Sequence, residues 1–173
     1  MERRKSNVAV PEPENLIFRD NLLQGEDVLI KEITCSTGVF HEDEIEIAKE
    51  LALENIQKGP EKSGYRFVVC EYRSKPVGYT CYGEIPCTKD RFDLYWIVVQ
   101  HELRGMHIGQ KLMSVTEDKV REKGGKKIYI ETSSRDLYLG TRKFYERCDY
   151  VAEAIFKDFY DDGDDKWVFV KNL

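Results

Sequence analysis

The chain has 173 residues, of which 41% are hydrophobic and 34% charged, and its net charge is −5. This length fits a single domain with a sizeable core, and the scattered Lys and Arg residues of an acidic chain argue against a nucleic-acid partner. We expect no membrane span, because no run approaches roughly 20 apolar residues, and no metal site, because His and Cys show no ligand spacing.

Five cysteines without a C-x-x-C pair are typical of reduced thiols, and no apolar signal segment follows the start, so we expect a cytoplasmic protein. Residues 1–25 are polar and contain Pro11 and Pro13. They predict an N-terminal arm or an added edge segment, followed by a single domain over residues 26–173.

The first half of that domain alternates between helix and strand patterns. Residues 27–36, with Val28, Ile30 and Ile33 among polar residues, predict a first strand. A helix is predicted over residues 42–57, because its apolar residues recur at helical spacing and Gly and Pro follow it.

Three strands are then predicted in meander order, over residues 65–72, 77–83 and 92–99. After a glycine-containing turn, a helix runs toward Gly124-Gly125, which acts as a stop. A strand over residues 127–132 follows this helix and is therefore predicted to run parallel to the previous strand.

The chain closes with a helix over residues 137–147 and a hairpin of strands 150–160 and 166–171, with Gly163 in its turn. The elements together predict a mixed α/β fold: a mostly antiparallel sheet with one parallel crossover.

The turn between the strand ending at Val99 and the following helix has the features of a phosphate site. Gly105 and Gly109 allow close backbone approach, and a helix N-terminus offers unpaired N–H donors and partial positive charge. Arg104 adds a forked cationic donor. A plain strand–helix turn is the alternative; a P-loop is excluded because no Gly-Lys-Ser/Thr follows.

Two blocks of sequence resemble a known family. Arg104 and Gly109 match the Arg/Gln-x-x-Gly-x-Gly/Ala signature of the GNAT N-acetyltransferases, with His107 at the middle glycine. Downstream, residues 141–150 resemble the family's Ala-x-x-Phe-Tyr-Glu-x-x-Gly-Phe/Tyr block; Phe144 and Tyr145 match, whereas Thr141 replaces alanine and Asp149 replaces glycine. The resemblance covers roughly residues 27–171.

The resemblance implies the GNAT fold, in which two neighbouring parallel strands splay apart, and acetyl-CoA as co-substrate. The pantetheine arm would enter the gap between those strands, and the diphosphate would rest on the glycine-containing turn. The cofactor-binding residues that it implies are Ile97, Val98, Val99, Arg104, Gly105, His107, Ile108, Gly109, Gln110 and Tyr138.

Acetyl transfer to an amine needs a base for the amine, a donor for the oxyanion and a proton for the leaving thiolate. Tyr145 matches the family's usual general acid, and a backbone N–H of Ile97 or Val98 is the implied oxyanion donor. Glu131 is the first candidate base, with Asp93 and Glu84 as alternatives.

The acceptor is less closely specified. We expect its pocket between residues 39–57, the loop 84–90 and the closing hairpin. The aromatic wall is expected to come from Tyr79, Tyr82, Tyr95 and Trp96.

Such a wall fits a small amine, an amino acid, for which D-alanine-like acceptors are a lead from similar bacterial GNATs, or a peptide N-terminus. The sequence does not decide between a monomer and a homodimer. The alternative functions are a catalytically inactive acyl-CoA-binding or regulatory module, protein N-terminal acetylation, and a nucleotide-phosphate binder unrelated to CoA.

Overall fold

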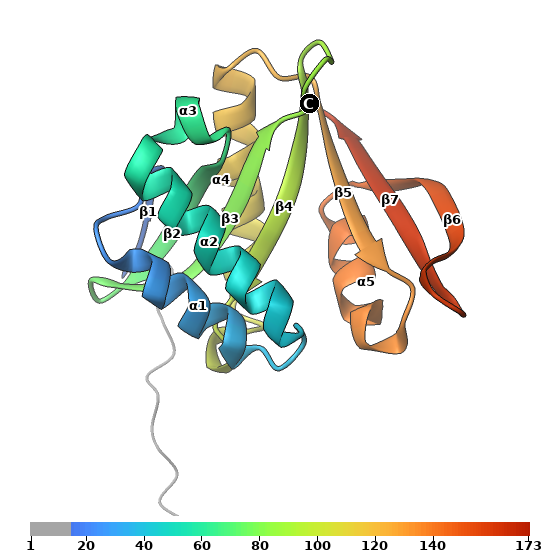
Figure 1. The fold of residues 1–173 in the computed structure, drawn as a ribbon, viewed down its shortest axis with the longest axis horizontal. Helices are drawn as coiled ribbons and strands as arrows, with labels where there is room; N and C mark the ends of the chain where they lie inside the picture. Colours follow the sequence, from blue (N-terminus) through green and yellow to red (C-terminus); the bar gives the residue numbers. More distant parts are fainter. Residues whose placement is uncertain (1–14) are drawn as a thin grey trace, which may run out of the picture.

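A seven-stranded mixed sheet in the order β1-β2-β3-β4-β5-β7-β6 organises the computed structural model, which describes residues 15–173 (Figure 1). The strands are β1 (Leu16–Arg19), β2 (Arg66–Tyr72), β3 (Lys75–Glu84), β4 (Arg91–Val99), β5 (Lys127–Ser133), β6 (Val151–Asp161) and β7 (Asp164–Asn172). Neighbouring strands are antiparallel except β4 and β5, which are parallel. The predicted fold class and the predicted parallel crossover are therefore confirmed.

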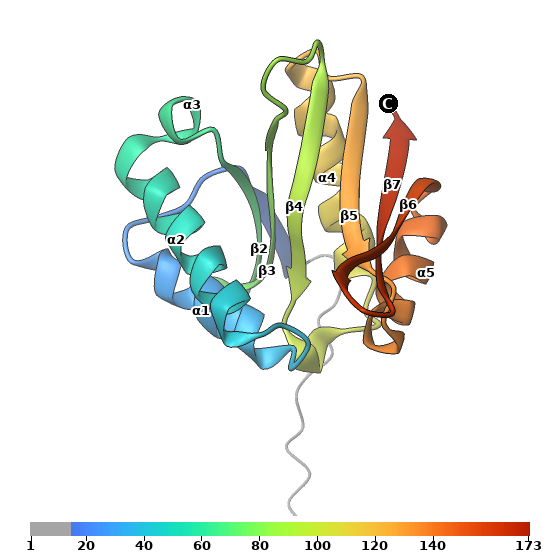
Figure 2. The ribbon, with the colours of Figure 1, turned by 45° about the vertical axis from the view of Figure 1, so that its right-hand side comes forward.

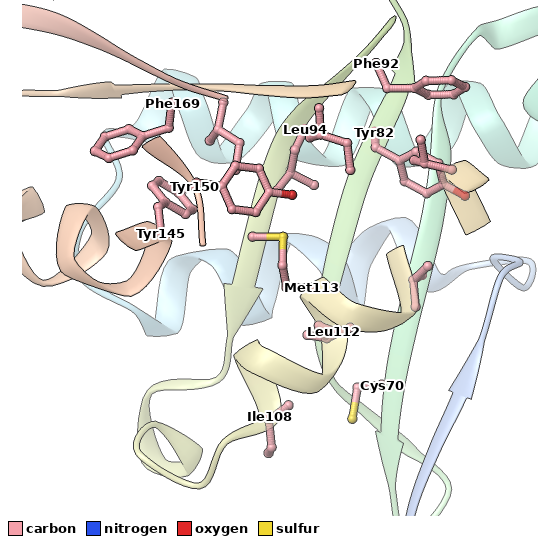
Figure 3. Packing of buried hydrophobic residues seen from close by; sticks show 14 of the residues in the cluster. Cys70, Tyr82, Phe92, Leu94, Ile108, Leu112, Met113, Tyr145, Tyr150 and Phe169 are labelled. Carbon is pink, nitrogen blue, oxygen red and sulfur yellow. The ribbon is translucent and has the colours of Figure 1, made fainter. Parts of the chain in front are cut away.

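Helices cover both faces of the sheet. They are α1 (Glu26–Ser36), α2 (Glu42–Lys58), α3 (Pro60–Ser63), α4 (Ile108–Glu122) and α5 (Leu139–Arg147). Helices α1 and α2 lie over β2 to β4 on one face, and α4 lies on the other (Figure 2). One buried cluster lies on each side, with Ile30 and Tyr79 under α1 and α2, and Leu112 and Met113 of α4 in the larger cluster (Figure 3).

The strand predicted over residues 27–36 is wrong, because this segment is helix α1. Its β-branched residues favour a strand, but Ile30, Ile33 and Thr34 are buried at the i, i+3, i+4 spacing of one helix face. Thr34 also donates its hydroxyl to the Ile30 carbonyl at 2.7 Å, inside the helix. Tertiary burial along a 3.6-residue period outweighs the local strand propensity.

The remaining predicted elements are present, with ends shifted by a few residues, and α3 is an unpredicted single turn. Gly163 has φ 79°, as the hairpin turn requires. Residues 1–14 of the expected N-terminal arm lie outside the described residues. Just after them, β1 pairs antiparallel with β2 at the edge of the sheet.

Strands β4 and β5 pair only at their beginnings. The parallel ladder joins Arg91 to Lys127, Phe92 to Ile128 and Asp93 to Tyr129, and then ends. Beyond this last rung the two strands diverge, as Figure 1 shows, although β4 continues for six residues and keeps its pairing with β3. The sheet is therefore open along one edge of β4, and backbone groups there have no strand partner.

No helix within residues 15–173 is long and apolar enough to cross a membrane. In the same part of the chain, no group of three His, Cys, Asp or Glu side chains is arranged to hold a metal ion.

Candidate active site

A cavity of about 1300 Å³ opens where β4 and β5 diverge. Its walls come from β4, β5, the turn before α4, the start of α2, helix α5 and the tip of the β6–β7 hairpin. All twelve residues predicted for cofactor binding or catalysis line this cavity, although they lie up to 48 residues apart in the sequence. The fold therefore brings the two motif blocks and the candidate base to one site.

The open edge of β4 presents backbone donors to the cavity. Gln100 donates its N–H to the Val77 carbonyl of β3 at 2.8 Å. Because N–H groups alternate along a paired strand, the Val98 N–H also points to β3, whereas those of Ile97 and Val99 point into the gap. Of the two predicted oxyanion donors, the alternation favours Ile97 over Val98.

The turn before α4 holds the backbone conformations that its glycines suggested. Gly105 has φ 80° and His107, the N-cap of α4, has φ 60°. His107 stands at the family's middle glycine, and it keeps the left-handed conformation that glycine adopts most readily. The first amides of α4, from Ile108 to Gln110, have no acceptor within the helix. The departure from the motif thus leaves the shape of the turn and its donors in place.

Cationic and polar side chains surround this helix N-terminus. Arg104 is exposed beside it, and His107 Nδ1 lies 2.6 Å from Gln110 Oε1. Arg147 of α5 also lines the cavity, one turn after Phe144. Positive side chains and open amides at one place form a surface suited to phosphate oxygens.

Tyr145 is a buried side chain of the site. It is 6% exposed and packs against Tyr150 and Phe169, with ring centroids 6.4 and 5.5 Å away (Figure 3). Its side chain lines the cavity. Burial raises the pKa of Tyr145 well above the usual value near 10, so the phenol holds its proton at neutral pH.

The departure at the last glycine of the second motif block also keeps the local geometry. Asp149, at the family's last glycine, has φ 65°. Tyr138 is 8% exposed, forms the N-cap of α5, and lies under the guanidinium of Arg135 at 5.5 Å. Burial is the main cause of its raised pKa.

Two carboxylates lie near the last rung between β4 and β5. Asp93 is half-buried, and its desolvation, followed by the charge of Glu131, raises its pKa to about 6. Glu131 also lines the cavity but is exposed, and its carboxylate forms an ion pair with Lys166 Nζ at 3.1 Å. Desolvation therefore acts on Asp93, while Glu131 has its own counter-ion.

Some expectations about the pocket are wrong. Glu84 and the loop 84–90 do not line the cavity, and the Glu84 carboxylate is mainly exposed, 3.9 Å from Arg66. Tyr79 is fully buried against α1, where its hydroxyl meets Thr34 Oγ1 at 2.7 Å, and Tyr82 packs in the α4-side cluster. The two tyrosines are buried on opposite faces of β3, and only Tyr95 and Trp96 of the expected aromatic wall line the cavity.

A polar network at the end of β5 was not predicted. Ser133 Oγ donates to Asp164 Oδ1 at 2.5 Å, and Arg135 Nε lies 3.3 Å from Asp164 Oδ2. Arg142 of α5 donates to the Ser133 carbonyl at 2.6 Å. These contacts fix the hairpin tip to β5 and α5, and so define one wall of the cavity. Polar residues at the carboxyl end of a parallel strand were the available sequence signal.

A model of the acetyltransferase (GNAT) family matches residues 30–150. Comparison with curated proteins gives no match.

Solved structures agree with the family match. A GNAT-family protein from Desulfovibrio desulfuricans is 36% identical, with a TM-score of 0.88 over 91% of this chain and 98% of that one. The ribosomal-protein-S18-alanine N-acetyltransferase of Escherichia coli is 14% identical, with a TM-score of 0.72 over 91% and 94% of the two chains.

PaiA N-acetyltransferase of Thermoplasma acidophilum, solved in complex with coenzyme A, is 17% identical, with a TM-score of 0.71 over 91% and 99%. The last two likenesses concern the fold. The family model spans well over half of the chain, and the Desulfovibrio protein resembles nearly all of it. The chain therefore belongs to the acetyltransferase (GNAT) family.

Proposed function

We propose that this protein transfers the acetyl group of acetyl-CoA to the primary amine of a small molecule, by direct attack within a ternary complex. The observation that carries the proposal is the opening between β4 and β5. It exposes strand amides, the N-terminus of α4 and the Tyr145 hydroxyl to one cavity. A thioester, a diphosphate and a leaving thiolate each need one of these three groups.

The cavity fits acetyl-CoA from one end to the other. The Val99 amide is free to bind an amide group of a pantetheine arm, as another strand would. The open amides of α4, with Arg104 beside them, suit a diphosphate. The relatives solved with coenzyme A have the same fold, which supports the cofactor assignment.

In the proposed reaction, the amine lone pair attacks the thioester carbonyl carbon and the carbonyl oxygen becomes an oxyanion. The Ile97 N–H is our candidate donor to that oxyanion. As the C–S bond breaks, Tyr145 donates its phenolic proton to the sulfur. The apolar surroundings that raise the pKa of Tyr145 also disfavour a free thiolate, so the proton passes to the sulfur as the C–S bond breaks and no separate thiolate forms.

The amine must lose a proton, and we assign this proton to Asp93, with Glu131 retained as the second candidate. Only about one aliphatic amine in a thousand is neutral near pH 7. Asp93, with a pKa of about 6, is mostly ionised at that pH and is a stronger base than an ordinary carboxylate. It lies at the rung where the gap begins, whereas Glu131 is ion-paired.

An amino-acid acceptor, including a D-alanine-like one, is the finer alternative within this proposal. It requires a cation for the acceptor's carboxylate. Arg135 is the arginine on the wall formed by the hairpin tip, and its Nε already binds Asp164. A small amine without a carboxylate is therefore our preferred acceptor.

The inactive-module alternative rests on His107, Tyr138 and Asp149, which stand at altered motif positions. His107 and Asp149 keep the positive φ that glycine adopts most readily, so these two departures leave the backbone conformation in place. The deciding experiment incubates the protein with acetyl-CoA and a broad panel of amines and follows thiol release. Binding of acetyl-CoA without turnover of any amine would favour the inactive module.

A further inference from the structure

The charged residues of the cavity are separated by sign. Arg104 and Arg147 lie toward the α4 N-terminus, where we place the diphosphate. The opposite walls, made by α2, the sheet and the hairpin, carry five carboxylates: Glu44, Asp93, Glu131, Asp161 and Asp164. Among the described lining residues, Arg135 is the one Lys or Arg on that side.

Arg135 is already engaged. Its Nε contacts Asp164 at 3.3 Å, and both terminal nitrogens lie 3.5 Å from His41 Nε2. Lys166, which does not line the cavity, forms an ion pair with Glu131. An acceptor carboxylate would therefore have to displace Asp164 from Arg135 and would face the remaining acids, so the site disfavours a zwitterionic amino acid.

Acids line the cavity from several elements. Glu44 belongs to α2, Glu131 to β5 and Asp164 to β7. Tyr160, about half exposed on the same lining, has its pKa raised to about 12 by partial desolvation, and the charges of Glu131, Asp164 and Glu44 add to this shift. Asp93 extends the acidic lining to the last rung between β4 and β5, where the gap begins.

Aromatic side chains line the same side. Phe40 meets Trp96 edge-on with centroids 5.1 Å apart, and Tyr65 meets Tyr95 at 5.7 Å. All four line the cavity. Aromatic faces next to carboxylates attract alkylammonium groups and accommodate the methylenes between them.

We propose that the acceptor carries at least two positive charges separated by an alkyl chain, as in a diamine or polyamine. One amine reacts beside Asp93, and the second ammonium is held at the mouth by Glu44 and Asp161. This inference rests on the proposed acetyl transfer. The site itself is defined by the cavity and the 94% buried side chain of Tyr145 that lines it, and the carboxylates select among acceptors.

Three acceptors of equal length test the charge requirement: 1,4-diaminobutane, 1-aminobutane and 4-aminobutanoate. They differ only in ending with an ammonium, a methyl or a carboxylate. We expect kcat/KM to be roughly tenfold higher for the diamine than for aminobutane, the size of one partly solvated charge pair. Aminobutanoate should be the poorest substrate, and added salt should reduce the diamine preference.

Glu44→Gln removes one charge at the mouth and keeps an oxygen that can still accept the His41 N–H, now bonded at 2.8 Å. The ratio of diamine to aminobutane should fall severalfold. Asp43→Asn is the matched control, because it removes a charge from the same helical turn but lies outside the cavity lining. The ratio should stay as in the unaltered protein.

Equal kcat/KM for the diamine and aminobutane, or a preference for aminobutanoate, would overturn the inference while leaving acetyl transfer intact. If none of the three releases thiol, the proposed function fails for these acceptors, and calorimetric titration of the CoA-loaded protein decides the inference separately. Tighter binding of diaminobutane than of aminobutane supports it. Equal binding of the two overturns it.

Discussion

Gly109 of α4 lies against the ring of Phe144 of α5. A Cβ built on Gly109 would come 3.3 Å from Phe144 Cε2 and 3.9 Å from Val99 Cγ2. The first motif block therefore depends on the second, because the ring supports the turn of α4 whose amides face the cavity. This contact gives Gly109 a packing role in addition to the backbone access inferred from its motif.

Gly109→Ala should raise the KM for acetyl-CoA severalfold. The added methyl forces the ring or the helix to move by a few tenths of an ångström, and the donors move with it. Thermal stability should change little, since roughly 1 kcal/mol of better helix propensity offsets the crowding. Gly140→Ala is the stability control: its Cβ meets nothing within 4 Å, so the melting temperature should rise. An unchanged KM in Gly109→Ala would show that the turn tolerates the shift.

Arg104→Ala should raise the KM for acetyl-CoA about fivefold, or about 1 kcal/mol, because the side chain is exposed and solvent screens its charge. The change in kcat should be smaller, since the contact forms in both ground and transition states. Steady-state kinetics at low and high ionic strength measure the effect, and salt should shrink it. No change in KM would mean that the diphosphate rests on backbone amides alone.

Tyr145→Phe should lower kcat by roughly 10²-fold or more, the usual contribution of a positioned acid. The folded state should lose little stability, because phenylalanine keeps the ring that packs against Tyr150 and Phe169. Thiol-release kinetics and a melting curve together separate catalysis from folding. Full activity in this variant would remove Tyr145 from the proposed mechanism.

Tyr150→Phe provides the matched control for that variant. Its ring lies 6.4 Å from that of Tyr145, and its hydroxyl is buried without a partner among the described residues. The same substitution should stabilise the protein by about 1–2 kcal/mol, because a desolvated hydroxyl is removed. Tyr150 does not line the cavity, so thiol release should be retained.

Much of the fold follows from local pattern. The parallel crossover, the closing hairpin and the cofactor turn are each specified by neighbouring residues, such as Gly163 in its turn. Helix α1 was missed because Ile30 and Ile33 satisfy both a strand propensity and a helical period. The choice between the two depends on burial beneath α2 and against β3, which no short window of sequence contains.

The cofactor side of the cavity was also easier to predict than the acceptor side. Arg104, Gly109 and Tyr145 lie in blocks whose spacing has a chemical meaning. The acceptor side joins Glu44 of α2 to Asp164 of β7, residues far apart in the chain. The aromatic residues of this side depend on the register between β3 and β4. Its shift between Cys81 and Tyr82 leaves Tyr95 as an extra residue on β4, and both Tyr95 and Trp96 line the cavity.

Asp93→Asn should greatly reduce turnover at neutral pH, with partial recovery at high pH where the neutral amine is abundant. It should also stabilise the fold. Below the unfolded pKa of 3.8, Asp93 is protonated in both states; between 3.8 and about 6, only the folded state holds the proton. Stability therefore falls as pH rises through this window, and above pH 6 the ionised side chain destabilises the protein by about 1–2 kcal/mol after solvent screening.

The variants of Glu131 distinguish the two candidate bases. If Asp93 is the base, Glu131→Gln removes a nearby negative charge, lowers the pKa of Asp93, and moves the acid limb of kcat/KM below pH 6. Lys166→Gln should move that limb in the opposite direction, because it frees the Glu131 charge that Lys166 now neutralises at 3.1 Å. Opposite shifts from two neighbouring substitutions are difficult to produce by structural damage. If Glu131→Gln instead loses turnover at neutral pH and recovers it at high pH, while Asp93→Asn remains active, the proton is accepted by Glu131, and Asp93 serves only to hold the acceptor.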